Sequence, residues 1–410
     1  MNPLVRDYLL LGLRLGRLVD GLVDCYYGDP ALRDQVAAEP PPDPRELSRQ
    51  AGRTLAALGD SDLGPARRRY LTAQLAALRA VADRLAGTPM SFRDEVRAYF
   101  DVDVTRTPPE RYAAVHDEID ALLPGPGPLA DRVEEFYRRN TVPPERLHRC
   151  VQAVSDALRE RTRDRFGLPA TERVEYTVVR DAPWNAYNRY LGGFRSAVAL
   201  NAASGRSVAA LPIIVAHESY PGHHTEHCLK EAGLVRDGGQ DEHTIALVDT
   251  PRCLVTEGLA EAAVDAVLGP GWGEWTAGIL AGEGVHVEGE RVERMRGLIV
   301  RLLPARVDAA LLLHDEGGDR AEALAHLRRW MLLPPDRAEQ MVTFAADPLW
   351  RAYSVTYSEG GRLVDAWLAA REPGTSLADR FDTLLREPLL PSQLRADVAG
   401  TAETTKGVCR

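Results

Sequence analysis

The chain has 410 residues, of which 45% are hydrophobic and 27% are charged, which is the composition of an ordinary globular protein. Its formal net charge of −10 argues against sequence-independent binding to nucleic acid or to an anionic membrane, because both require a basic surface. The five cysteines lie far apart and form no CxxC pair. This spacing argues against a thiolate zinc cluster and a disulfide framework, and it favours reduced thiols.

The N-terminal segment does not have the pattern of a targeting signal. Charged residues interrupt its apolar stretch at Arg6, Asp7, Arg14 and Arg17, whereas a signal peptide requires an uninterrupted apolar run and a small-residue cleavage site. No apolar run of about 18 residues occurs in the sequence, so no transmembrane helix is predicted. We therefore expect a cytoplasmic protein with no membrane partner and no nucleic-acid partner.

Residues 1–168 are predicted to form an N-terminal helical region. Apolar residues from Leu9 to Val23 recur at helical spacing and predict a first helix. The proline-rich segment 40–44 must interrupt the helices, and Asp43 before Pro44 is typical of a helix start. Further helices are expected at about 44–59, 64–87, 91–101, 108–123, 128–139 and 143–166.

Residues 169–410 are predicted to form a second region that is fused with the first into one continuous fold. The β-branched and aromatic run VEYTVV (174–179) predicts one strand, and residues 196–201 predict another. From about Val208 the chain is predicted to be helical to its end. This order of helices, a small β-element and further helices predicts a mainly α fold with a small sheet.

The dipeptide His217-Glu218 follows an apolar run (211–216) and matches the first half of the zinc-binding HExxH pattern. In that pattern, two histidines four residues apart share one face of a helix and bind one ion, while the glutamate activates a water molecule. Here the second histidine position holds Pro221, and histidines follow instead at His223 and His224.

A straight helix cannot bring these histidines to one ion. Positions i and i+7 are about 10 Å apart along a helix axis, whereas a Zn–N bond is about 2.0–2.1 Å long. The pair Pro221-Gly222 permits a distortion. A bulge of two residues would return His223 to the position of the second histidine, so we predict His223 as the second ligand. His224 would then bind substrate or support the ligands. The alternative, in which His224 is the second ligand in place of His223, stays open.

A carboxylate on a later helix is expected to complete the site. Glu257 lies 39 residues after Glu218, and Glu261 follows one helical turn later, where it could orient a ligand histidine. Two histidines, one glutamate and a water molecule form an open tetrahedral zinc site. We therefore predict that His217, His223 and Glu257 bind one Zn²⁺ and that Glu218 is the general base. The same ligand set also suits Fe²⁺.

At these residues the chain resembles the bacterial family known as domain of unknown function 885 (DUF885), whose members carry an HExxPGHH motif and a later EGW-A helix. The resemblance covers most of the chain and includes residues 18–32 (LVDGLVDCYYGDPAL), 211–226 (LPIIVAHESYPGHHTE) and 257–260 (EGLA). It implies a zincin-like (gluzincin) helical fold with a small sheet beside the metal-binding helix and with residues 169–410 as the catalytic region. The implied activity is that of a metallopeptidase.

Two further segments resemble family motifs and imply roles for their residues. Arg306 is implied to bind a substrate carboxylate, with an ion pair to a neighbouring acid as the alternative. His314 is implied to donate a hydrogen bond to the developing oxyanion, and Tyr357 to stabilise the tetrahedral intermediate. The chain departs from the family at residues 351–353, where RAY replaces Pro-Gly-Gln, and at Leu259, which replaces a tryptophan.

Three functions are compatible with this sequence. The first is a zinc-dependent hydrolase of a peptide or a related amide bond, acting on a small peptide or an amino-acid-like small molecule whose extended backbone pairs with the strand at 196–201. The alternative is a non-hydrolytic metalloenzyme of small-molecule metabolism, such as a lyase, a decarboxylase or an Fe²⁺ oxygenase. The third is a non-catalytic binding protein with a vestigial site, although Glu218 argues against it because a structural metal site needs no base.

Overall fold

The computed structural model describes residues 1–180, 184–202, 211–348 and 350–408, with side chains described as far as residue 401. Helices dominate, and five short strands form two small sheets. The predicted mainly α fold with a small sheet is therefore confirmed. The predicted start of a helix near Val208 falls outside the described residues, and the described part of that helix begins at Leu211.

The N-terminal region consists of helices joined by proline-rich turns. The six helices predicted between residues 44 and 166 are all present, and their ends differ from the prediction by at most two residues. Asp43 caps one of them, since its side chain accepts a hydrogen bond from the backbone nitrogen of Arg45 at 3.0 Å. The helices of this region are α1 (Pro3–Leu15), α2 (Pro30–Ala38), α3 (Pro44–Leu58), α4 (Pro65–Leu85), α5 (Phe92–Phe100), α6 (Pro109–Leu122), α7 (Leu129–Arg139) and α8 (Pro144–Phe166).

The prediction that one helix continues from Leu9 to Val23 is wrong. Helix α1 ends at Leu15, the chain turns, and strand β1 (Val23–Tyr26) pairs antiparallel with β5 (Ile245–Leu247). Gly16 caps the helix, and Gly21 has a φ of 86°, which a glycine adopts readily and other residues rarely do. The apolar spacing continued through the turn because the turn is also partly buried.

The larger sheet has three strands in the order β2-β4-β3. The predicted strands are present as β2 (Arg173–Val179) and β4 (Arg195–Asn201), which run parallel, while β3 (Ala186–Gly192) pairs antiparallel with β4. Strand β3 was not predicted, because its asparagine, arginine and glycine residues are poor strand formers. Strand β4 is central, so both of its edges are occupied. The prediction that this strand pairs with a substrate backbone is therefore wrong.

The C-terminal region is helical except at β5, where the prediction of helix to the end of the chain is wrong. Helix α12 is largely buried, and α10, α19 and η3 pack against it. The elements are α10 (Leu211–Glu218), α11 (His223–Lys230), η1 (Glu231–Asp237), η2 (Asp241–Thr244), α12 (Pro251–Leu268), α13 (Trp272–Gly282), α14 (Gly289–Val300), α15 (Pro304–His314), α16 (Arg320–Trp330), α17 (Pro335–Ala346), α18 (Trp350–Tyr353), η3 (Thr356–Gly360), α19 (Gly361–Ala369), α20 (Leu377–Arg386) and α21 (Pro391–Val408).

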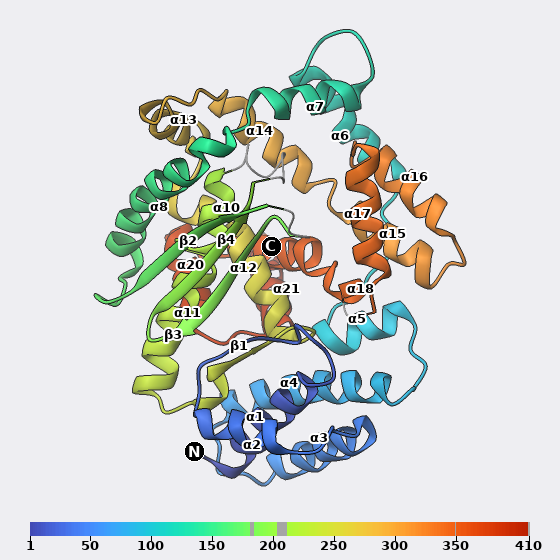
Figure 1. The fold of residues 1–410 in the computed structure, drawn as a ribbon, viewed down its shortest axis with the longest axis vertical. Helices are drawn as coiled ribbons and strands as arrows, with labels where there is room; N and C mark the ends of the chain where they lie inside the picture. The colour runs from blue at the N-terminus through green and yellow to red at the C-terminus, as the bar shows by residue number, and fades with distance from the viewer. Residues whose placement is uncertain (181–183, 203–210, 349, 409–410) are drawn as a thin grey trace.

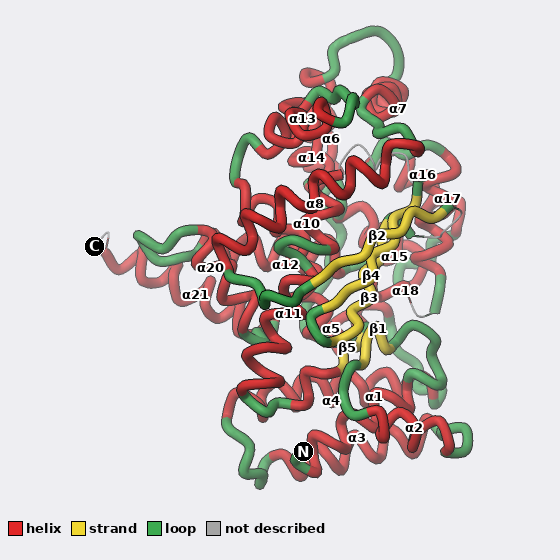
Figure 2. The backbone as a smooth tube through the Cα atoms, turned by 60° about the vertical axis from the view of Figure 1, so that its left-hand side comes forward, coloured by secondary structure: helices red, strands yellow, loops and turns green. Residues whose placement is uncertain are grey.

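One large hydrophobic core contains residues of both predicted regions, among them Leu71 of α4 and Leu254 of α12. The larger sheet lies along α8, α10 and α11, and α12 runs through the middle of the molecule (Figures 1 and 2). No helix within the described ranges is both long enough and apolar enough to cross a lipid bilayer. The fold thus places the helices α10, α11 and α12, which carry the predicted ligands, next to one another.

Candidate metal centre

The segment between α10 and α11 forms the distortion that the sequence predicted. Helix α10 ends at Glu218 and α11 begins at His223, and between them the backbone nitrogen of Gly222 donates to the carbonyl oxygen of Ala216 at 2.8 Å. A Cβ atom on residue 222 would lie only 1.9 Å from the carbonyl oxygen of His217, so only glycine fits this turn. The turn brings the Nε2 atoms of His217 and His223 to 3.1 Å from each other.

Glu257 on α12 completes a group of three possible ligands. Its Oε2 lies 3.5 Å from Nε2 of His217, and its Oε1 lies 3.6 Å from Nε2 of His223. In a tetrahedral site with bonds of about 2.05 Å, ligand atoms are about 3.3 Å apart. The observed spacings of 3.1–3.6 Å match this value without a rearrangement of the backbone. Oε2 of Glu257 is also buried without a hydrogen-bond partner among the described residues, as a ligand atom would be.

His224 points away from this group. Its Nδ1 lies 2.9 Å from the hydroxyl of Ser196, and its Nε2 lies 3.1 Å from Oε2 of Glu172. Burial alone would raise the pKa of Glu172, but hydrogen bonds from His224, Tyr220 and Arg159 lower it to about 2. This buried network holds the turn against β4 and α8. Glu172 could not be recognised from the sequence, because a single glutamate before a strand is common.

The charges around His217 favour a cation at this point. Burial lowers the pKa of a histidine, but the carboxylates of Glu257, Glu218 and Glu261 raise that of His217 to about 9. Burial and the neighbouring charge of His217 lower the pKa of His223 to about 4. Three acids thus stabilise one positive charge next to two imidazoles, which suits a divalent metal ion.

Glu261 lies behind the ligand His217, where the sequence predicted it. Its Oε1 is 3.6 Å from Nδ1 of His217, and its other oxygen forms an ion pair with Arg296. A carboxylate behind a ligand histidine fixes the orientation and tautomer of the ring. Arg296 in turn fixes the carboxylate.

Glu218 has the environment of a general base. Burial raises its pKa from 4.5 to about 7, and the nearby charge of Glu257 contributes to the increase. Its backbone carbonyl accepts a hydrogen bond from the side chain of Asn188 on β3. A carboxylate with a pKa near neutrality can both accept and return a proton. Asn188 was not predicted as part of the site, because β3 itself was not predicted.

Two tyrosines cover the other side of Glu257. The hydroxyl of Tyr353 donates to Oε1 of Glu257 at 2.8 Å, and the ring of Tyr357 lies edge to face with that of Tyr353, with centroids 5.6 Å apart. The element η3, which carries Tyr357, approaches α12 closely at two glycines, since a Cβ on Gly258 would lie 2.3 Å from the carbonyl oxygen of Gly360. Tyr353 was missed, although its spacing of four residues from Tyr357 is a helical signal.

Arg306 lies beside these tyrosines. Its guanidinium carbon is 4.9 Å from the centroid of the Tyr357 ring, and its Nε is buried without a hydrogen-bond partner among the described residues. Burial lowers the pKa of Arg306. No acid among the described residues forms a direct ion pair with it. The predicted alternative of an ion pair with a neighbouring acid is therefore not observed.

His314 is the predicted site residue that the structure does not bring to the cluster. Its Nε2 lies 2.8 Å from the carbonyl oxygen of Ala345, and its ring stacks on Phe92 with centroids 5.7 Å apart. It sits at the C-terminal end of α15, eight residues after Arg306. The two residues are therefore about 12 Å apart along the helix axis.

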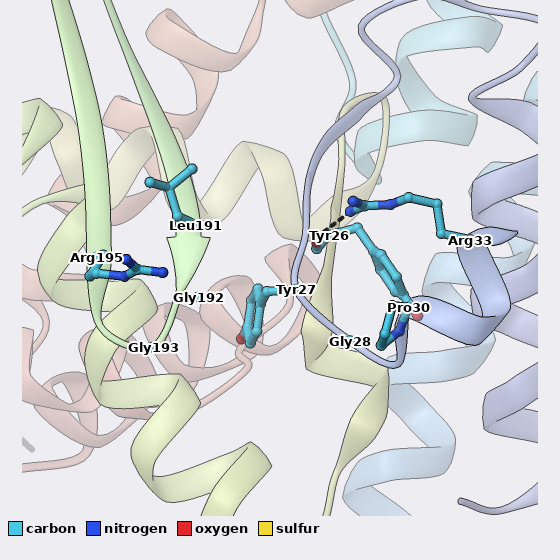
Figure 3. A pocket seen from close by; sticks show the side chains of 9 residues that line it. All are labelled: Tyr26, Tyr27, Gly28, Pro30, Arg33, Leu191, Gly192, Gly193 and Arg195. Carbon is cyan, nitrogen blue, oxygen red and sulfur yellow. Dashed lines mark hydrogen bonds between the residues drawn. The ribbon is translucent and has the colours of Figure 1, made fainter.

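A surface cavity of about 400 Å³ is lined by none of the residues His217, His223 and Glu257. It is formed between the β3–β4 turn and the segment that joins β1 to α2, and the side chain of Tyr27 points between these two parts (Figure 3). None of its lining residues belongs to the cluster, and the guanidinium of Arg33 is engaged by the backbone oxygen of Tyr26 at 2.6 Å. This cavity therefore contributes no group to the chemistry of the site.

Comparisons with known proteins add information on the fold. No family model and no curated protein matches the chain. A crystal structure from Colwellia psychrerythraea, of a protein provisionally named a lipoprotein, is 13% identical with a TM-score of 0.52, and the match covers 87% of this chain and 66% of that one. A structure from Shewanella oneidensis, provisionally named a lipoprotein of unknown function, is 13% identical with a TM-score of 0.46, covering 86% and 72% of the two chains. This chain thus spans slightly less than two thirds of the Colwellia protein, with which it shares a fold.

Proposed function

We propose that this protein is a metal-dependent hydrolase of peptide bonds or related amide bonds, in which His217, His223 and Glu257 hold one zinc ion. The observation that carries the proposal is the spacing of 3.1–3.6 Å among the three ligand groups, next to an acid with a pKa of about 7. The sequence resemblance to DUF885, which implies a zincin-like fold, supports this function.

A zinc ion held by His217, His223 and Glu257 would supply Lewis acidity, which polarises a carbonyl group and lowers the pKa of a water molecule towards about 7. Glu218 takes a proton from the attacking water as the new C–O bond forms. It then delivers this proton to the nitrogen as the C–N bond breaks, so that the products are a carboxylic acid and an amine. The hydroxyl of Tyr357 donates to the oxyanion of the tetrahedral intermediate. Arg306 binds a carboxylate of the substrate through its unpaired guanidinium.

The test combines metal analysis with assays of hydrolysis. Wild-type protein should contain about one zinc ion per chain, whereas the variants His217→Ala and Glu257→Ala should lose it. The matched control is His148→Ala, because His148 is exposed and distant from the cluster in the sequence. Metal content would be measured by mass spectrometry.

Glu218→Gln separates metal binding from catalysis. This variant should keep its zinc and lose hydrolysis of a pool of small peptides by at least about 100-fold, because general-base catalysis contributes about 10²–10⁴-fold. Full hydrolysis in Glu218→Gln would refute the role of the base. Iron in place of zinc, together with oxygen consumption, would favour the oxygenase alternative, since the same ligands suit Fe²⁺.

A further inference from the structure

Asp24 lies at an irregularity of strand β1. Val23 pairs with Leu247 and Cys25 pairs with Ala246, so Asp24 is an extra residue between two consecutive partners of β5. Such a β-bulge turns a side chain away from its regular direction and is common next to active sites. The carboxylate of Asp24 lies within 4.8 Å of a ring nitrogen of His227 and of the Cys25 sulfur.

This position is adjacent to the metal cluster. His227 follows His223 by four residues on α11, which corresponds to one turn and about 6 Å along the helix axis. The charge of Glu257 contributes to the raised pKa of Asp24, and the charge of Asp24 contributes to that of Glu218. Asp24 lies near the face of α11 that carries His223, because its neighbour His227 is one helical turn further along that helix.

The carboxylate of Asp24 forms no ion pair with a lysine or arginine of the described residues. Burial and the charge of Glu257 raise its pKa to about 6, and a hydrogen bond from Tyr187 and the charge of Arg252 offset this increase only in part. The ring of His227 is stacked on Tyr190 with centroids 4.5 Å apart, and its Nδ1 is buried without a hydrogen-bond partner among the residues described. Burial also lowers the pKa of His227, so this ring is neutral and has a nitrogen that accepts hydrogen bonds.

An ammonium group can bridge the carboxylate of Asp24 and the ring of His227, which lie near each other without direct contact. No hydrogen bond or ion pair joins Asp24 to His227 or Cys25, although all three ligand atoms lie within 4.8 Å of one another. Ligands of a zinc ion are about 3.3 Å apart. Acceptors around a tetrahedral ammonium group, with hydrogen bonds of about 2.8–2.9 Å, are about 4.7 Å apart.

We propose that Asp24, with His227, binds the free α-amino group of the substrate, so that the protein is an exopeptidase acting at the N-terminus of short peptides. The inference rests on the proposed hydrolase function. An anchor about 6 Å from the ligand His223 along α11 leaves room for one or two residues between the amine and the cleaved bond. With Arg306 on the other side of Glu257 for the carboxylate, the preferred substrates are peptides of a few residues with both ends free.

The experiment compares free and blocked substrates on the zinc-loaded full chain. Wild-type protein, Asp24→Asn and the matched control Asp20→Asn would be assayed on a pool of dipeptides and tripeptides and on the same pool after N-acetylation. Asp20 is an exposed acid on the same segment. Cleaved products would be identified by mass spectrometry.

Wild-type protein should prefer the free peptides by about 10- to 150-fold in kcat/KM, which is the range for a charged hydrogen bond. Asp24→Asn should lose this preference by slowing only the free peptides, while Asp20→Asn should keep it. Equal cleavage of both pools by the wild type, or an equal loss on both pools in Asp24→Asn, would overturn the inference and leave the hydrolase function intact.

A binding measurement decides the inference if no peptide is cleaved. Calorimetry on the zinc-loaded protein would compare a phosphinic dipeptide analogue that has a free amine with its N-acetyl form. Tighter binding of the free-amine form in wild type but not in Asp24→Asn supports the amine site even if the hydrolase function fails. Equal binding of the two forms contradicts it, as does a second zinc ion per chain that Asp24→Asn removes.

Discussion

Gly222→Ala should separate the two ligand histidines, because the added methyl group has no space in the turn between α10 and α11. The new Cβ would lie 1.9 Å from the carbonyl oxygen of His217 and 2.3 Å from that of Ala216. Contacts of this kind are essentially never shorter than 3.0 Å, so the backbone must move by about 1 Å. The atom that must move belongs to His217 itself, and metal–ligand distances tolerate changes of only about 0.2 Å.

The expected result is a loss of at least about 100-fold in zinc affinity, since changes to groups that merely support a ligand already cost about 10–100-fold. Competition with a chelator of known affinity would measure it. Gly233→Ala is the matched control, because nothing lies within 4 Å of a Cβ added there and its φ is not left-handed. Wild-type zinc affinity in folded Gly222→Ala would refute the proposed role of the turn.

Three other substitutions test the remaining parts of the site. Burial and the charge of Glu257 raise the pKa of Glu218 from 4.5 to about 7, so in metal-free protein this acid destabilises the fold as pH rises over that range. Glu218→Gln should therefore stabilise the protein by up to about 3 kcal/mol at pH 8 and by little at pH 4.5. Urea unfolding at the two pH values would measure this difference. Tyr353→Phe removes the hydrogen bond to Glu257 and should weaken zinc binding by about 10–100-fold in the same chelator competition. Unchanged zinc affinity would show that the Tyr353 hydroxyl does not help to position Glu257. Burial alone would raise the pKa of Glu172, but its hydrogen bonds lower it from 4.5 to about 2. Glu172→Gln should therefore lose about 3 kcal/mol of stability at pH 7 and almost none at pH 2. An equal loss at both pH values would contradict the role of these hydrogen bonds.

The helices could be predicted from the sequence because neighbouring residues determine where each helix begins and ends. Asp43 caps α3, and Pro44 begins this helix with a fixed φ. Neither effect depends on the rest of the fold. Strand β3 and strand β1 could not be predicted in this way. Asn188 in β3 is held by its partner β4 and by the backbone of Glu218, and β1 pairs with a strand more than 200 residues away.

The ligand set was predictable to the extent that its geometry is local. His217 and His223 are six residues apart, and the Pro221-Gly222 pair between them restricts how the turn can bend. The groups that surround the ligands come from distant elements, so no spacing identifies them. Tyr353, the last residue of α18, donates a hydrogen bond to Glu257 of α12, and the ring of His314 contacts Ala345 of α17 and Phe92 of α5.

Protein contacts hold the candidate ligand residues in place. Oε1 of Glu226 accepts hydrogen bonds from Lys230 at 2.6 Å and from Thr256 at 3.1 Å, which ties α11 to α12 next to the ligands on each helix. Buried polar groups of this kind are costly unless each has its partners, so a shift of either helix would expose several unsatisfied groups at once. Because these contacts already place the candidate ligand atoms at tetrahedral spacing, binding of the proposed zinc ion would require little reorganisation. The affinity of the site then depends on the packing that surrounds it as much as on the three ligands.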